Sequence, residues 1–179
     1  MSTVQKVNFE PVSDVLPVQR RDFPLADPTL AQPLNALALV DGEWMTLNAS
    51  YKLVRAADVT VLGTAGSGGI ATARAFPLFA ERGRYDTQAI SGTKMPVLYR
   101  GDYEFDTRIF DASAVCGSGA AITAALQPLK AATIVLGGRN YTGLVGHGGA
   151  SDASPVLGYV TRLPASNGGK LRFINGWRQ

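Results

Sequence analysis

The stretch that decides the fold class is Val97-Leu98-Tyr99-Arg100-Gly101-Asp102-Tyr103-Glu104-Phe105-Asp106-Thr107-Arg108-Ile109-Phe110. Its second half alternates aromatic or aliphatic residues with charged residues, which is the pattern of a strand with one buried and one solvated face. Gly101 and Asp102 are both typical turn residues. The stretch therefore predicts an antiparallel hairpin with strands over 97–100 and 103–110.

A second hairpin is predicted closer to the N-terminus. Asp41-Gly42 separates the apolar run 37–40 from residues 43–47, and this dipeptide favours a type I′ turn. Pro77 interrupts the apolar segment 70–79, which favours an edge strand over a helix there. Further short strands are predicted over residues 51–55, 58–62, 132–136, 141–145, 156–163 and 170–174.

The remaining segments read as turns and loops. The chain contains 20 glycines in 179 residues, above the usual share of roughly 7%, and glycine at this density favours tight turns. Residues 63–69 are expected to form a flexible loop and 164–169 a turn, whereas 120–126 are compatible with a short helix. We therefore predict a mainly β fold, a sandwich or barrel-like domain of short antiparallel strands.

Residues 1–35 differ from the rest of the chain, because they hold five of its ten prolines with single apolar residues between them. Proline fixes its own φ and pushes the preceding residue towards extended conformations. We expect an extended N-terminal arm without regular secondary structure, docked on its own domain or on a neighbouring subunit. Residues 36–179 are expected to form the β-rich domain.

Composition narrows the function classes. Charged residues make up 17% of the chain, below the roughly 25% typical of soluble domains, which suggests a surface partly covered by a partner. The net charge of +3 comes from scattered basic residues, so no nucleic-acid footprint is seen. A single cysteine, Cys116, indicates a reducing compartment. No run of 18 apolar residues or signal peptide is recognised, so no membrane association is expected.

One glycine pattern resembles a dinucleotide-binding fingerprint. Gly66, Gly68 and Ala71 follow a predicted strand with the fingerprint spacing. The motif requires a helix directly after the glycines, but Pro77 interrupts that region, and Asp86 is the one candidate for the acidic partner. A surface loop is the preferred interpretation, and no cofactor is expected.

The other candidate sites are also better explained structurally. Ser151, His147 and Asp152 are the residue types of a hydrolase triad, but no nucleophile elbow precedes them. His147 and Cys116 lack companion ligands at metal-binding spacing. Arg100-Gly101-Asp102 spells an adhesion tripeptide that the predicted turn already explains. Glu104 and Asp106 are expected on the wet face of their strand. We therefore predict no enzymatic activity and no catalytic, cofactor-binding or metal-binding residues.

The C-terminal segment is expected to be docked, either in the sheet of the domain or at a subunit contact. Leu171, Phe173 and Trp177 lie on alternate positions of a strand-like segment, so their side chains are expected to face one surface. A core strand is preferred over an interface strand.

The whole chain resembles, in style, the virion proteins of tailed bacteriophages, in particular small head-decoration (capsid cement) proteins. The resemblance rests on the Pro-rich arm, the segment from Leu34 to Leu47 and the ending from Gly168 to Trp177. It implies a structural protein on the capsid exterior, made in the host cytoplasm. It would bind the major capsid protein and form homo-oligomers, with trimers favoured.

Two alternatives remain open at the sequence level. One is another virion component, of the tail or baseplate. The other is a β-sandwich module that binds carbohydrate or a receptor, which would need exposed aromatic side chains on one concave face. The candidates for that face are Trp44, Tyr99, Tyr103, Tyr141 and Trp177.

Overall fold

The structure is a computed structural model, and it describes residues 9–11, 19–31, 39–40, 42–48, 50–56, 75–77, 94–100, 104–113, 119–152, 154–166 and 169–175. These residues form strands β1 to β11 and one 3-10 turn, η1 (Pro28–Ala31). All strand pairs are antiparallel. The predicted mainly β fold of short antiparallel strands is confirmed.

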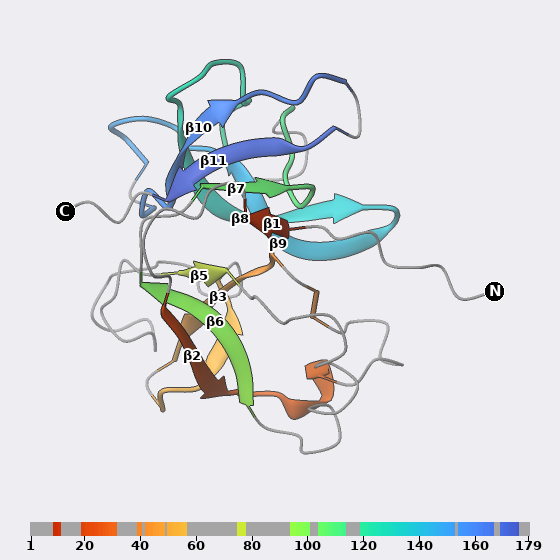
Figure 1. The fold of residues 1–179 in the computed structure, drawn as a ribbon, viewed down its shortest axis with the longest axis vertical. Helices are drawn as coiled ribbons and strands as arrows, with labels where there is room; N and C mark the ends of the chain where they lie inside the picture. Colours follow the sequence, from red (N-terminus) through yellow and green to blue (C-terminus); the bar gives the residue numbers. More distant parts are fainter. Residues whose placement is uncertain are drawn as a thin grey trace.

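A six-stranded sheet forms the upper part of the molecule in Figure 1. Its order is β1 (Phe9–Pro11), β7 (Glu104–Thr107), β11 (Leu171–Asn175), β10 (Gly158–Arg162), β8 (Pro128–Leu136) and β9 (Arg139–Gly146). The chain leaving β7 returns to the opposite edge, where the Leu144 N–H donates to the Ile109 carbonyl (3.0 Å) and the Asp111 N–H donates to the Leu144 carbonyl (2.9 Å). The sheet therefore curls into a half-barrel.

Two smaller sheets lie below it in the same view (Figure 1). One pairs β2 (Gln19–Pro24) with β6 (Lys94–Arg100). The other places β3 (Trp44–Leu47) between β4 (Leu53–Arg55) and β5 (Phe76–Pro77).

Strand β3 connects the two parts because both of its faces are buried. The Trp44 side chain packs against Phe173 of the six-stranded sheet, with 5.9 Å between the ring centroids. The next residue, Met45, faces a second apolar cluster that includes Phe23 and Val97 of the two-stranded sheet. The described residues thus form separate apolar clusters on the two faces of β3, and this strand contributes a side chain to each.

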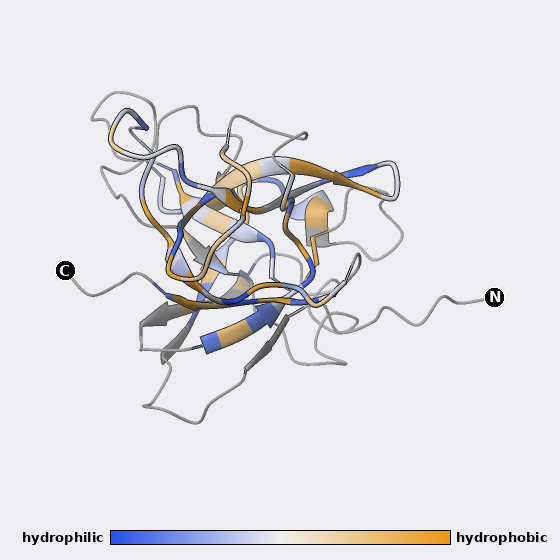
Figure 2. Cartoon of the chain, turned by 90° about the horizontal axis from the view of Figure 1, so that it is seen from above, coloured by the Kyte–Doolittle hydropathy of each residue, from blue (hydrophilic) through white to orange (hydrophobic). Residues whose placement is uncertain are grey.

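The β8–β9 hairpin is packed on both faces. Leu129 and Leu144 belong to the main core, whereas Ile134 and Val145 join Ile109 in a third cluster on the other face. The end of the hairpin extends past the neighbouring strands (Figures 1 and 2). Its turn is formed by Gly137 and Gly138, whose φ values are 60° and 79°.

Both predicted hairpins that start from a turn dipeptide are wrong in their pairing. Residues 94–100 and 104–107 are strands, but β6 pairs with β2 while β7 pairs with β1 and β11, so they belong to different sheets. At Asp41-Gly42 the turn forms, with a φ of 87° at Gly42 and a 3.2 Å hydrogen bond from the Glu43 N–H to the Val40 carbonyl. Strand β3 is nevertheless flanked by β4 and β5, and residues 39–40 are outside any strand.

The C-terminal half follows the prediction more closely. Strands β10 and β11 form an antiparallel pair with Val160 opposite Phe173, on either side of the predicted turn. Leu171 and Phe173 are fully buried, which confirms the core-strand interpretation for these two residues, while Trp177 lies outside the described residues. The short helix considered for 120–126 is absent: Ala120 bridges to Gly146, and turns follow. Pro77 does lie in an edge strand, β5.

Two pieces of the predicted N-terminal arm are strands of the domain itself. Phe9–Pro11 pairs with β7, and Gln19–Pro24 pairs with β6. For these residues the expectation of no regular secondary structure is wrong, because their extended backbones find partners within the same chain. The other residues before 19 lie outside the described part.

Candidate functional sites

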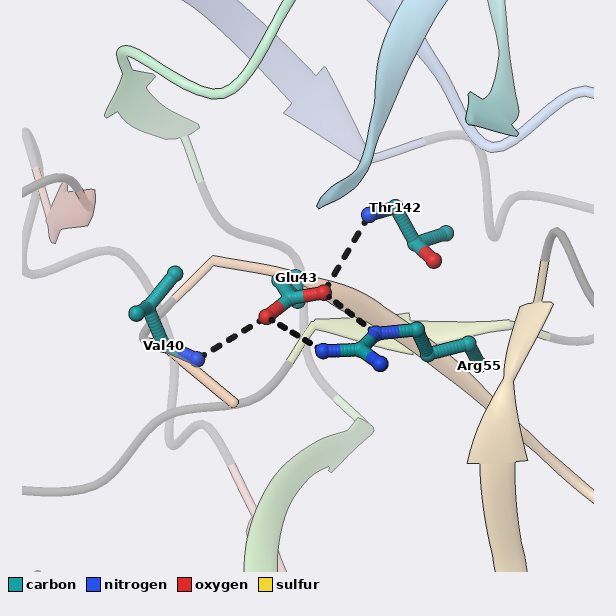
Figure 3. Close-up of polar contacts among 4 residues, drawn as sticks. All are labelled: Val40, Glu43, Arg55 and Thr142. Atoms are coloured by element: carbon teal, nitrogen blue, oxygen red, sulfur yellow. Dashed lines mark hydrogen bonds and ion pairs between the residues drawn. The ribbon is translucent and has the colours of Figure 1, made fainter. Parts of the chain in front are cut away.

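The most buried charged group in the described part is the carboxylate of Glu43, which precedes β3 and has no exposed surface. Four donors surround it (Figure 3). Its Oε2 accepts hydrogen bonds from Arg55 Nε at 2.8 Å and from the Thr142 N–H at 3.2 Å. Its Oε1 accepts from the Val40 N–H at 3.0 Å and from Arg55 Nη2 at 3.5 Å. Glu43 therefore joins β4 to β9 of the half-barrel.

The geometry at Glu43 is that of a structural joint. A buried carboxylate is tolerated when a cation and hydrogen-bond donors satisfy its oxygens. Arg55 is itself mostly buried, with 14% of its side chain exposed. General acid–base catalysis would require a substrate proton within hydrogen-bond reach, but these contacts enclose both carboxylate oxygens.

A second polar cluster organises the loop after β9. Asp152 binds Lys130 of β8 at 2.7 Å, and it accepts hydrogen bonds from the Gly148 N–H at 2.9 Å and the Ser154 N–H at 3.0 Å. Burial works against the charged form, but the hydrogen bonds from Lys130, Gly148 and Ser154 outweigh it and hold the pKa of Asp152 well below its usual range. The carboxylate therefore stays ionised and ties the loop to the sheet.

His147 lies in this loop and bonds to the main chain. Its Nδ1 accepts a hydrogen bond from the Gly149 N–H at 3.2 Å, so Nε2 carries the proton and donates to the Ser154 carbonyl at 2.9 Å. Both ring nitrogens are engaged, and Asp152 is directed to Lys130. The structure therefore does not bring Ser151, His147 and Asp152 together as a catalytic triad.

A third polar cluster covers the outer face of β7 and β11. Arg172 binds Asp106 through two hydrogen bonds, of 2.9 Å and 3.1 Å, and Arg162 approaches the same carboxylate at 3.6 Å. The hydrogen bonds from Arg172 hold the pKa of Asp106 below its usual value, and the same hydrogen bonds raise the pKa of Arg172. Glu104 accepts a hydrogen bond from the Thr161 hydroxyl at 2.5 Å.

The expectation that Glu104 and Asp106 lie on a wet face is wrong. Asp106 is 8% exposed and Glu104 is half-buried. The reason is non-local: β7 is an inner strand between β1 and β11, and side chains of β10 and β11 cover its outer face.

Several residues singled out in the sequence lie outside the described part: Gly66, Gly68, Ala71, Asp86, Gly101, Asp102, Cys116 and Trp177. The dinucleotide fingerprint and the adhesion tripeptide therefore stay untested. Among the described His, Cys, Asp and Glu residues, no group of three is placed to hold a metal ion. No described helix is long and apolar enough to span a membrane.

Of the five aromatic candidates for a binding face, only Trp44 and Tyr141 have described side chains, and neither is exposed. The side chains of Tyr99, Tyr103 and Trp177 lie outside the described part, so the aromatic face stays a prediction. Trp44 is 1% exposed and packs in the core. Tyr141 is half-buried beside the third apolar cluster, with the Arg139 guanidinium 4.9 Å from its ring centroid. Among the tyrosines whose side chains are described, the exposed ones are Tyr51 and Tyr159, which the sequence analysis did not single out.

Comparison with known proteins yields no relative. No protein-family model, curated protein or solved structure matches the chain.

Glu43 was the main residue that sequence reasoning missed. It is flanked by Gly42 and the apolar start of β3, and an acid in that setting is a signal for a buried ion pair. Its partners could not be read from the sequence, because Thr142 is 99 residues away.

Proposed function

We propose that this chain is a virion structural protein that decorates and stabilises a capsid shell by binding the major capsid protein. The observation that carries the proposal is the separation of charged from apolar side chains in the described part: the charged ones pair with one another, whereas large apolar ones are exposed. Charged groups bind one another at Glu43–Arg55 and Lys130–Asp152, which are largely buried, and at Asp106–Arg172 on the outer face of β7 and β11. The exposed large hydrophobic side chains of the described part lie mostly on or beside β8, β10 and β11: Tyr51, Leu126, Val135, Leu136, Tyr159, Leu163 and Ile174.

Paired charges and exposed apolar side chains are what we expect of a protein that binds to an assembly. Ion pairs that join strands across the sheets make the body rigid, and apolar side chains on a surface low in charge offer area for a partner. On a shell, many modest contacts act together, because each bound site raises the effective concentration at the next.

The direct test is co-sedimentation of the purified chain with shells that lack it. We expect saturable binding and a higher temperature of shell disruption. Tyr159→Ser/Ile174→Ser removes an exposed cross-strand apolar pair, and Thr123→Ala is a matched exposed control. Absence of sedimentation at any protein concentration contradicts the proposal.

A second candidate is a module that binds carbohydrate or a receptor, and the exposed Tyr51 and Tyr159 are the observation that favours it. Glycan-array binding lost in Tyr51→Ala or Tyr159→Ala, without shell binding, would support this function instead. A tail or baseplate component would bind tail structures rather than shells in the same sedimentation assay.

A further inference from the structure

On the side that faces away from β9, no described strand pairs with the outer half of strand β8. Strand β10 pairs with β8 only at Pro128 and Leu129, so the described strands leave the edge beyond Leu129 uncovered. Thr133 is exposed, and Val135 and Leu136 are 47% and 36% exposed.

The direction of the backbone groups on this edge follows from the hairpin register. Leu144 of β9 directs its N–H and carbonyl away from β8, to Ile109 and Asp111, and it lies opposite Ala131. In an antiparallel pair, residues directly opposite each other either both face the partner or both face away, alternating along the strand. Thr133 and Val135 therefore direct their N–H and carbonyl groups outwards.

This edge lacks the features that normally protect an exposed strand. Natural edges are blocked by charge, proline, bulges or covering loops. The other strands of the described part that border a sheet carry such residues: Pro11 in β1, Arg21 in β2, Arg55 in β4, Pro77 in β5, Lys94 in β6 and Arg139 in β9. By contrast, the eight residues 131–138 contain no charge and no proline, and Thr133, Ile134 and Val135 favour the β conformation.

We propose that this edge of β8 pairs with the same edge of a second copy of the chain, antiparallel and about a two-fold axis at Ile134. Thr133 of one copy then lies opposite Val135 of the other, and each such pair exchanges two backbone hydrogen bonds. The arrangement is self-complementary, as a two-fold contact requires. It sets β-branched side chains against each other and brings no like charges together.

The same features indicate which partner pairs with the β8 edge. A partner of opposite charge has nothing to recognise on an uncharged edge, whereas a second β8 supplies the matching donors, acceptors and neutral side chains. This inference stands apart from capsid binding, because self-association can be measured without shells.

The test is sedimentation velocity of the full chain over a range of concentrations. We expect a concentration-dependent dimer whose dissociation constant rises at least tenfold in Val135→Lys, because edge lysines oppose strand addition. Val135→Pro should act in the same direction, since it removes an outward N–H and no β8–β9 hydrogen bond. Asn140→Lys and Asn140→Pro are matched controls, because Asn140 lies opposite Val135 in the same hairpin but on the other edge.

The outcomes separate clearly. Circular dichroism establishes that each variant is folded, and Thr133→Lys replaces any variant that is not. A wild-type monomer at all concentrations overturns the proposal. An oligomer that the β8 variants leave intact, or that the Asn140 variants dissociate, also overturns it.

Discussion

The joint at Glu43 and the outer face of β7–β11 use the same chemistry in different surroundings. Each pairs a carboxylate with an arginine over a distance of 2.8–2.9 Å. Glu43 has no exposed surface and holds three segments of chain together. Arg172, in contrast, retains 24% exposure on a sheet that its core already holds in place. The comparison teaches that burial, rather than distance, decides how much an ion pair matters when one partner is lost.

The largest effect is expected at the joint. Glu43→Gln removes the negative charge that lies 2.8 Å from Arg55 Nε and turns an amide donor towards the surrounding N–H donors. Breaking a buried ion pair in this way costs about 3–5 kcal/mol. The free energy of unfolding, measured by urea titration, should fall by that amount. Glu104→Gln is the control, because Glu104 is half-buried and keeps its acceptor for Thr161. A similar loss in both variants would remove the distinction between the two regions.

Steric packing beside the joint gives the next largest effect. A Cβ on Gly143 of β9 would meet the Ile134 side chain and would lie 2.6 Å from the Ile109 carbonyl oxygen. Gly143→Ala should therefore cost about 1–3 kcal/mol through overpacking, seen as a lower Tm in calorimetry. Thr133→Ala, on the exposed side of the same hairpin, should leave the Tm nearly unchanged. An unaltered Tm in Gly143→Ala would show that β9 can move away from Ile109.

Acid should weaken the outer clusters. The folded-state pKa values of Asp106 and Asp152 lie below those of the unfolded chain. Their contribution is therefore complete above about pH 4 and is lost as the pH falls below it. Urea midpoints at pH 6 and pH 3 should differ, and the difference should be smaller in Asp152→Asn. An equal difference in wild type and Asp152→Asn would mean that Asp152 does not contribute.

The smallest effect is expected for the Asp106–Arg172 pair. A double-mutant cycle with Asp106→Asn and Arg172→Gln should give a favourable coupling that is smaller than the coupling of Glu43 with Arg55. It should also decrease as salt is added, because exposed charges are screened. A coupling energy that does not change with salt concentration would mean that the Asp106–Arg172 pair behaves like the buried Glu43–Arg55 pair.

The sequence predicted strands well and their partners poorly. The period-two pattern located β7, and the turn at 164–169 correctly joined β10 to β11, because both are local features. The hairpins at 37–47 and 97–110 failed because β3 and β7 each have stronger partners elsewhere in the chain. The same limit applies to the site: the acidity of Asp106 depends on Arg172, 66 residues away, so no local pattern could show that its strand is covered.

The pairing of β1 with β7 has a consequence for synthesis. Phe9 lies opposite Thr107, so roughly a hundred residues separate the two strands. At about 5–20 residues per second, β1 leaves the ribosome on the order of ten seconds before its partner strand exists. Such distant pairing slows folding, whereas the β8–β9 hairpin can close within microseconds of its own completion. Strand β1 therefore stays without its partner while about a hundred residues are made, whereas β8 and β9 can pair as soon as both have been made.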